Sequence, residues 1–225
     1  MKFNFKELIK GLAVICSYFI LQIIYCMPFL FLYNEKKISE NTLYIIVFTC
    51  MIVTYVIAYR KTLSKDLKDF KENYKTILKT TAKYWLIGLG IMIISSLFIG
   101  LLGLENATNQ EQNITLFKNE PITQAILAIL LAPILEEIVF RKSFQNFTNN
   151  KILFALVTGL IFGGIHVVSS ITSIKDIGMI LHIIPYSSVG IMLGYAYKEH
   201  NNILGTITIH TLHNFIGIIE IMLFI

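Results

Sequence analysis

The chain has 225 residues, of which 55% are hydrophobic and 15% charged, and it carries a formal net charge of +5. The mean hydropathy of +0.68 is typical of an integral membrane protein, and no hydrophilic stretch is long enough to form a separate soluble domain. The three cysteines have no CxxC spacing, which argues against a disulfide framework and a zinc knuckle. Any activity is therefore expected within the bilayer or at its edge.

Apolar stretches long enough to cross a hydrocarbon core, which takes about 20 helical residues, recur along the whole chain. There are seven of them, at 8–33, 43–59, 84–104, 122–140, 152–171, 177–197 and 203–225. The first is too long for the core of a signal peptide and lacks a small-x-small cleavage site, so we expect it to be retained. These features predict an all-α, polytopic transmembrane helix bundle of about seven spans.

The positive charges predict the orientation in the membrane, because Lys and Arg are enriched on the cytoplasmic side. With the N-terminus inside, 15 of the 19 Lys and Arg residues fall on that side and four on the other. We therefore expect a multi-pass protein of the cell membrane with a cytoplasmic N-terminus. After seven spans the C-terminus would face outward.

Two polar connections separate the expected spans of the first half. The segment 60–83 carries apolar residues at steps of three or four among lysines, which predicts a cytoplasmic amphipathic helix lying on anionic lipid. A docking surface for a partner is the alternative. The segment 105–120 is a polar loop before Pro121, a favourable first residue for a helix. We divide the chain into N-terminal membrane helices with an interfacial helix (1–120) and a helical core (121–225).

The core begins with a span that contains two adjacent carboxylates, Glu136 and Glu137, followed by Arg141. Charged groups inside a membrane cost roughly 2.5 to 3.5 kcal/mol each on insertion scales, so they usually face a partner or a water-filled cavity. Glu137 and Arg141 are four residues apart and can pair on one helix face, whereas Glu136 points about 100° away. A carboxylate without a counter-ion suits a general base or acid. The alternative is that both glutamates only pair with basic residues for helix assembly.

Polar side chains also interrupt two later spans. His166 lies deep in the stretch 152–171, and His210 and Asn214 share a face of the last span. If the helices around residue 150 form a hairpin, Glu136 and His166 lie roughly 21 and 24 Å from the turn, at one level. His213 is turned partly aside, but it would replace His210 near the glutamates if the last helix were rotated.

Small residues at the spacings Gly159-xxx-Gly163 and Gly190-xxx-Gly194 allow helices to approach closely. They predict a compact packing of the C-terminal half.

The polar clusters occur in a fixed order on successive membrane helices: Glu136-Glu137-xxx-Arg141, Phe162-xxx-His166 and His210-xxx-Asn214. This ordered set resembles the three motifs of the CPBP intramembrane proteases. That family includes the CAAX prenyl endopeptidases of the Rce1 type and the bacterial Abi proteins linked to bacteriocin processing and self-immunity. The resemblance covers residues 121–215, and it departs from many members at Lys142, where they have glycine.

The resemblance implies a glutamate-based peptide hydrolase. In this reading Glu136, positioned by His166, activates a water molecule, and His210 and Asn214 donate hydrogen bonds to the oxyanion. The implied substrate is a membrane-associated peptide or protein: a prenylated CAAX protein in eukaryotic relatives, and a leader, signalling or bacteriocin-related peptide in bacterial ones. We expect the lipid bilayer as a partner and no nucleic acid.

The remaining motif residues would support this site. Glu137 belongs to the implied catalytic set because it could titrate jointly with Glu136, while Arg141 and Phe162 are expected to support the site. The resemblance implies no cofactor. A glutamate with two histidines is also a conceivable zinc ligand set, although the chain has no HExxH motif, so zinc stays as an alternative.

Two readings from other functional classes remain. A non-catalytic bacteriocin self-immunity or membrane scaffold protein would use the same fold to bind a peptide, but such a binder does not require Glu136 and His210 together. A proton-coupled transporter would also place Glu and His inside the membrane. The chain lacks obvious inverted repeats, which argues against transport.

Overall fold

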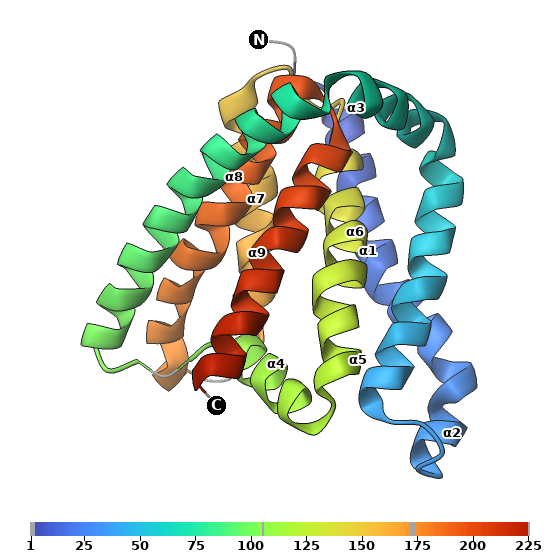
Figure 1. The fold of residues 1–225 in the computed structure, drawn as a ribbon, viewed down its shortest axis with the longest axis vertical. Coiled ribbons are helices and arrows are strands. Elements are labelled where there is room, and N and C mark those ends of the chain that lie inside the picture. The colour runs from blue at the N-terminus through green and yellow to red at the C-terminus, as the bar shows by residue number, and fades with distance from the viewer. Residues whose placement is uncertain (1–2, 105, 172–173, 225) are drawn as a thin grey trace.

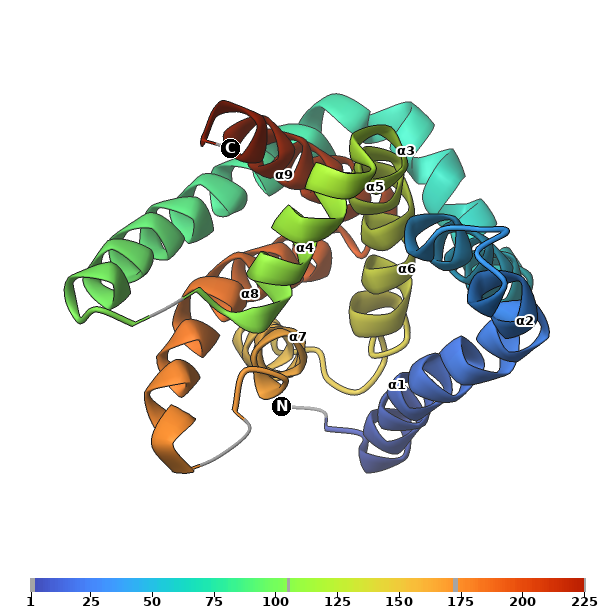
Figure 2. The same ribbon diagram turned by 90° about the horizontal axis from the view of Figure 1, so that it is seen from below.

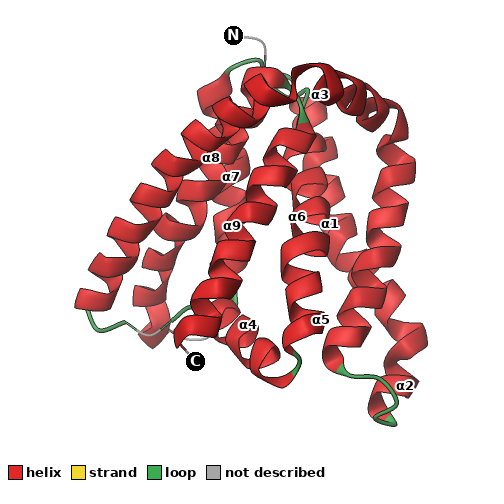
Figure 3. Cartoon of the chain, viewed as in Figure 1, coloured by secondary structure: helices red, strands yellow, loops and turns green. Residues whose placement is uncertain are grey.

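The computed structural model describes residues 3–104, 106–171 and 174–224, and this part of the chain is helical with short connections (Figure 3). The helices with α geometry are α1 (Phe5–Cys26), α2 (Leu30–Asn34), α3 (Glu40–Leu101), α4 (Thr108–Asn119), α5 (Pro121–Ile126), α6 (Ala132–Glu137), α7 (Lys151–Val168), α8 (Ile183–His200) and α9 (Ile203–Phe224). The segments η1 (Met27–Phe29) and η4 (Ile174–His182) are 3₁₀ helices, and η2 (Leu127–Leu131) and η3 (Ile138–Lys142) are π-helical. The predicted all-α bundle is confirmed.

Among the described residues, helices long and apolar enough to cross a membrane number six: Phe5–Asn34, Glu40–Leu101, Pro121–Lys142, Lys151–Val168, Ile177–His200 and Ile203–Leu223. The expected stretches numbered seven because α3 contains two of them. Many large apolar side chains on the outer faces are exposed, Ile94 and Leu97 among them, as lipid-facing side chains would be. The chain is therefore a multi-pass membrane protein.

Helix α3 was expected to be two spans with a separate amphipathic helix between them, and this expectation is wrong. The structure joins all three into one helix of 62 residues. A straight helix of that length would measure about 93 Å, three times the thickness of a hydrocarbon core. The helix is bent and not straight: Figure 1 shows that α3 runs along the bundle, arches over the end where the N-terminus lies and returns. The helix continues because its first 48 residues contain neither Pro nor Gly.

The segment 105–120, expected to be a loop, contains helix α4 in its described part. Figure 2 shows α4 lying across the middle of the end of the bundle opposite the arch of α3. Pro121 is the first residue of α5, as its position predicts. The two ends of the chain lie at opposite ends of the bundle (Figure 1), while the side of the membrane that each faces stays a prediction.

The apolar core has two parts. The larger part packs α1 and the first limb of α3 against α6, η3 and α7, and includes Met51, Leu135 and Phe154. The smaller part packs the returning limb of α3 against α8 and α9 through Trp85 and Leu193, among others. The N-terminal half thus contributes core residues to both faces of the C-terminal helices.

The glycine spacings bring α7 and α8 into close contact, as predicted. A Cβ atom added at Gly159 would lie 2.5 Å from the backbone nitrogen of Ile191, and one added at Gly163 would lie 2.8 Å from that of Ser187. Gly190 faces the Cα of Gly159 in the same way. Only residues without a side chain allow these two backbones to approach so closely.

Candidate active site

The two glutamates lie on α6, a short α-helical piece between the π-helical segments η2 and η3. At its start Ala132 donates its N–H to the carbonyl of Leu127, five residues back, and at the far side Ser143 donates to the carbonyl of Ile138 over 3.1 Å. Such π-turns inside helices occur frequently at functional sites. A π-turn changes the direction in which the following side chains leave the helix. Here it sets the direction of the side chains of Glu136 and Glu137.

Glu137 and Arg141 form the predicted ion pair in the interior of the bundle. Glu137 Oε1 lies 3.2 Å from Arg141 Nη1, and both side chains are fully buried. The guanidinium of Arg141 also donates to the carbonyl of Gly190 over 3.1 Å and lies 4.8 Å from the ring centroid of Phe162. The close packing of α7 and α8 brings this carbonyl and this ring within reach. The expected supporting roles of Arg141 and Phe162 thus have a structural basis.

Glu137 has a second partner that sequence reasoning missed. Its Oε1 lies 2.9 Å from Nδ1 of His210 on α9. Because Glu137 is paired with Arg141, its carboxylate is the acceptor and His210 Nδ1 carries the donated proton. This hydrogen bond fixes the imidazole ring so that Nε2 points away from Glu137, an arrangement common to carboxylate-oriented histidines.

Glu136 is the more accessible acid, and both histidines converge on it. Its Oε2 lies 3.6 Å from His210 Nε2 and its Oε1 4.0 Å from His166 Nε2. Its side chain is 14% exposed, against 0% for Glu137. The predicted common depth of Glu136 and His166 is confirmed by their distance. The two neighbouring acids therefore occupy different environments, one buried with a permanent cation and one facing two imidazoles at the edge of the protein interior.

His166 is held by its own helix and by a neighbour from α8. Its Nδ1 lies 2.8 Å from the carbonyl of Phe162, so Nδ1 donates and Nε2 faces Glu136. The ring of Tyr186 stacks on the imidazole with centroids 5.3 Å apart and an angle of 23° between the planes. Tyr186 was not predicted, since nothing in its local sequence indicates which side chain it meets across two helices.

The last predicted residue, Asn214, lies further along α9. Its Nδ2 donates to the carbonyl of Ala128 over 2.8 Å. In the π register of η2 this carbonyl would pair with the N–H of residue 133, which is a proline and has none. Asn214 thus satisfies a backbone acceptor near the glutamate helix, and its role as an oxyanion donor stays a prediction.

The rotation of α9 places His210, not His213, against the glutamates. His213 Nδ1 accepts a hydrogen bond from Trp85 Nε1 of α3 over 3.3 Å. The two histidines of α9 therefore have different surroundings: His210 belongs to the glutamate cluster and His213 to the contact with the returning limb of α3.

A metal site needs several donor atoms that converge on one point. In the described part of the chain, no group of three or more His, Cys, Asp or Glu side chains is arranged to hold a metal ion. Zinc requires ligands that converge at about 2.0–2.2 Å. The expectation of a cofactor-free site stays a prediction, to be tested with chelators.

Together these residues form a compact polar cluster from four helices that could perform acid–base chemistry. It holds a partly accessible carboxylate, two imidazoles whose Nε2 atoms face it, and a buried carboxylate–arginine pair that orients one of them. A carboxylate base with neighbouring imidazoles is a common arrangement for moving a proton to or from water. The same groups would also suit a proton relay.

Comparison with known proteins bears on this cluster directly. Residues 118–216 match the family model described as "Type II CAAX prenyl endopeptidase Rce1-like". An uncharacterized protein of Mycoplasma capricolum subsp. capricolum is 29% identical over 170 residues, which cover 71% of this chain and 48% of that protein. The chain thus spans about half the length of this relative. No solved structure matches the chain. The matched stretch contains all seven residues of the three motifs, so residues 118–216 of the chain are similar to the Rce1-like CAAX prenyl endopeptidases in the region that carries the candidate site.

Proposed function

We propose that this protein is an intramembrane endopeptidase that hydrolyses a peptide bond of a membrane-associated peptide or protein. The observation that carries this proposal is the convergence of His166 and His210 on Glu136, at 4.0 and 3.6 Å. These separations are too long for direct hydrogen bonds and suit groups that share a bridging water. The family match supports the same class of chemistry.

In the proposed mechanism Glu136 acts as the general base. It takes a proton from water, and the oxygen of that water attacks the carbonyl carbon of the scissile peptide. The negative charge that forms on the carbonyl oxygen is stabilised by hydrogen-bond donors, for which we propose His210 and Asn214. Glu136 then passes its proton to the leaving nitrogen as the C–N bond breaks. His166 holds the carboxylate and the water in place.

The buried pair of Glu137 and Arg141 would act on the chemistry through His210. By accepting the Nδ1 proton over 2.9 Å, Glu137 keeps the His210 Nε2 atom directed at the reacting groups. Arg141 compensates the charge of Glu137, and its Nη2 donates a hydrogen bond to the carbonyl of Gly190. A carboxylate that orients a catalytic histidine contributes substantially to rate without touching the substrate.

The substrate would reach Glu136 from the membrane or from its edge, since the site lies among membrane helices. The family description names CAAX prenyl endopeptidases, which makes a prenylated C-terminus one candidate and a short bacterial leader, signalling or bacteriocin-related peptide another. We propose that the reaction needs no metal and takes place toward the cytoplasmic side, the side proposed for the N-terminus.

The test compares peptide termini in membranes and medium of cells that express the native chain, Glu136→Gln or Glu220→Gln at matched levels. Glu220 is exposed and lies on α9 away from the cluster, so it controls for the loss of a carboxylate. Termini that disappear only with Glu136→Gln would support proteolysis and identify the substrate. Identical termini in all three, with a phenotype that survives Glu136→Gln, would favour the non-catalytic immunity or scaffold function. Adding a chelator to isolated membranes tests whether a metal is needed.

A further inference from the structure

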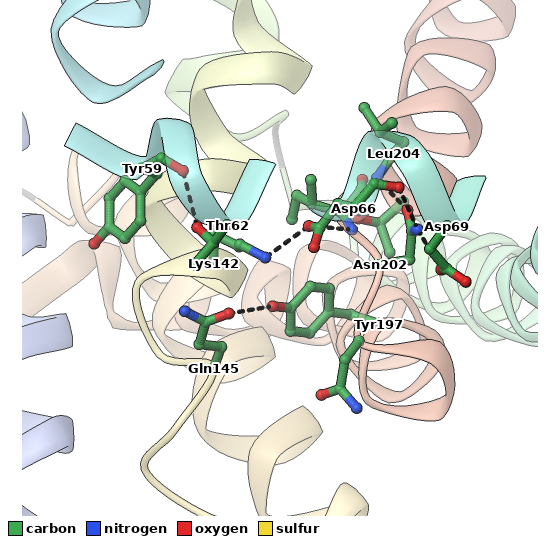
Figure 4. A network of polar contacts seen from close by, with 12 residues as sticks. Tyr59, Thr62, Asp66, Asp69, Lys142, Gln145, Tyr197, Asn202 and Leu204 are labelled. Atoms are coloured by element: carbon green, nitrogen blue, oxygen red, sulfur yellow. Dashed lines mark hydrogen bonds and ion pairs between the residues drawn. The ribbon is translucent and has the colours of Figure 1, made fainter. Parts of the chain in front are cut away.

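A second buried polar cluster lies beside the candidate site, where the arch of α3 meets the end of η3 and the start of α9. We call it the α3–α9 junction and define it by Asp66, Lys142 and Asn202 (Figure 4). All three residues are buried, with at most 7% of their surface exposed. Buried charges require partners, so the contacts of these residues define what the junction holds together.

One oxygen atom of Asp66 connects three segments of the chain. Asp66 Oδ2 lies 2.6 Å from Lys142 Nζ and also accepts the backbone N–H of Ile203 over 3.3 Å. Lys142 is the last residue of η3, and Ile203 is the first residue of α9. A carboxylate at the start of a helix is favourable because of the unpaired N–H groups and the dipole there. The side chain of Asp66 therefore connects η3, which follows Glu136 and Glu137, to α9, which carries His210.

Asn202 fixes the same contact from the other side. Its Nδ2 donates to the backbone carbonyl of Asp66 over 2.8 Å and to Oδ2 of Asp69 over 2.7 Å. Its Oδ1 accepts the N–H of Leu204 over 3.0 Å. The first turn of α9 thus has several hydrogen bonds to the arch of α3, as Figure 4 shows.

The junction lies close in sequence to residues of the candidate site on both helices. Lys142 directly follows Arg141, and Ile203 precedes His210 by seven residues, about two helical turns or 10 Å. Because a helix transmits a displacement of its end along its axis, the position of Ile203 influences where His210 meets Glu137. The contact that depends on this alignment is the 2.9 Å hydrogen bond between those two side chains.

We propose that Asp66 and Lys142 are positioning residues for the candidate active site: their ion pair sets the alignment of α6 and α9 and hence of His210 against the two glutamates. This inference rests on the proposed function. It assigns a role to Asp66, which lies in the half of the chain outside the matched stretch 118–216.

The first experiment measures the alignment without using activity. Backbone hydrogen–deuterium exchange is followed in lipid nanodiscs for the native chain, Asp66→Leu and Lys142→Met, with Glu72→Gln and Lys79→Met as controls. Glu72 and Lys79 are exposed residues of α3, the helix that contains Asp66. We expect exchange in residues 201–210 to rise about tenfold or more in the Asp66 variant and to stay unchanged in the controls. An unchanged exchange rate of residues 201–210 in Asp66→Leu would overturn the proposal that the junction fixes the start of α9.

The second experiment measures turnover of the peptide that shows the strongest Glu136-dependent cleavage in the comparison of termini. We expect kcat per folded molecule to fall about 10- to 100-fold in each single variant with KM within about twofold of native, since both side chains are buried at the junction and are not part of the candidate site. The double variant Asp66→Leu/Lys142→Met should recover thermal stability, because it leaves no lone buried charge, but not kcat.

The outcomes of the two experiments are distinct. Recovery of kcat together with stability in the double variant would show a purely structural pair and overturn the positioning role. If the native chain cleaves nothing, the proposed function fails. In that case increased exchange in Asp66→Leu would still support the proposal that the junction fixes the start of α9. The proposed effect of the junction on catalysis would be refuted together with the proposed function.

Discussion

The candidate site and the α3–α9 junction each pair a buried acid with a buried cation, yet they differ in how completely their polar atoms are satisfied. At the junction the side chains of Asp66, Lys142 and Asn202 all have hydrogen-bond or ion-pair partners. In the site, Glu137 Oε2 and Arg141 Nε are buried and make no hydrogen bond to the described residues, and Arg141 Nη1 has only its ion pair with Glu137 Oε1 at 3.2 Å.

This difference indicates different purposes. A fully satisfied buried network fixes one arrangement of the helices that carry it, whereas buried polar atoms left without hydrogen bonds cost stability and are retained mainly where function requires them. The junction is therefore expected to govern alignment, and the site to govern chemistry. The experiments below test this division from its largest expected effect to its smallest.

Glu136→Gln should produce the largest effect on chemistry with almost none on folding. We expect peptide cleavage to fall about 10²- to 10⁴-fold, because the general base is lost while the shape of the side chain is kept. The thermal midpoint should change little, since the carboxylate is partly exposed and lies 3.6 and 4.0 Å from its histidines. Cleavage rate and thermal unfolding of the purified protein check both parts. A large loss of stability would place Glu136 among the structural residues instead.

Arg141→Met should be the most destabilising substitution. It leaves the carboxylate of Glu137 fully buried without its cation, which costs about 3–5 kcal/mol. Reversible unfolding in mixed detergent micelles measures this free energy. The double variant Glu137→Gln/Arg141→Met serves as the control and should be less destabilised, because no unpaired charge remains. Equal losses in the two proteins would contradict the assigned charge pairing.

Gly159→Ala tests the close packing that brings the carbonyl of Gly190 to Arg141. The added methyl would lie 2.5 Å from the backbone nitrogen of Ile191, so we expect a loss of about 1–3 kcal/mol in the free energy of unfolding. Gly164→Ala on the same helix is the matched control. Nothing lies within 4 Å of its added Cβ, and it should be neutral or slightly stabilising. Similar stabilities of the two variants would refute the packing argument.

His213→Ala should have the smallest effect and separates the two histidines of α9. It removes the 3.3 Å hydrogen bond from Trp85, which contributes about 0.5–1.5 kcal/mol to stability. Cleavage per folded molecule should stay within about twofold of native. The same substitution at His210 should abolish cleavage. Cleavage assays of both variants side by side show which histidine of α9 acts in the candidate site. Loss of cleavage in His213→Ala alone would reverse the assignment.

The apolar stretches, the pairing of Glu137 with Arg141 and the glycine spacings were readable from the amino-acid sequence and are confirmed. Each depends on residues close together in the chain: hydrophobicity over about 20 residues, a step of four on one helix, or small residues one turn apart. The common depth of Glu136 and His166 followed from counting residues outward from one hairpin. Local periodicity was sufficient for all of these.

Other features depend on how distant helices pack. The partners of His210 and Asn214, the stacking of Tyr186 on His166 and the joining of two spans into α3 were missed or left open. The junction of Asp66 with Lys142 brings together residues 76 positions apart. Such contacts are set by the rotation and depth of each helix, which result from packing over the whole bundle and leave no local pattern in the chain. The sequence therefore specifies which groups can do chemistry, and the packing of the helices specifies which of them meet.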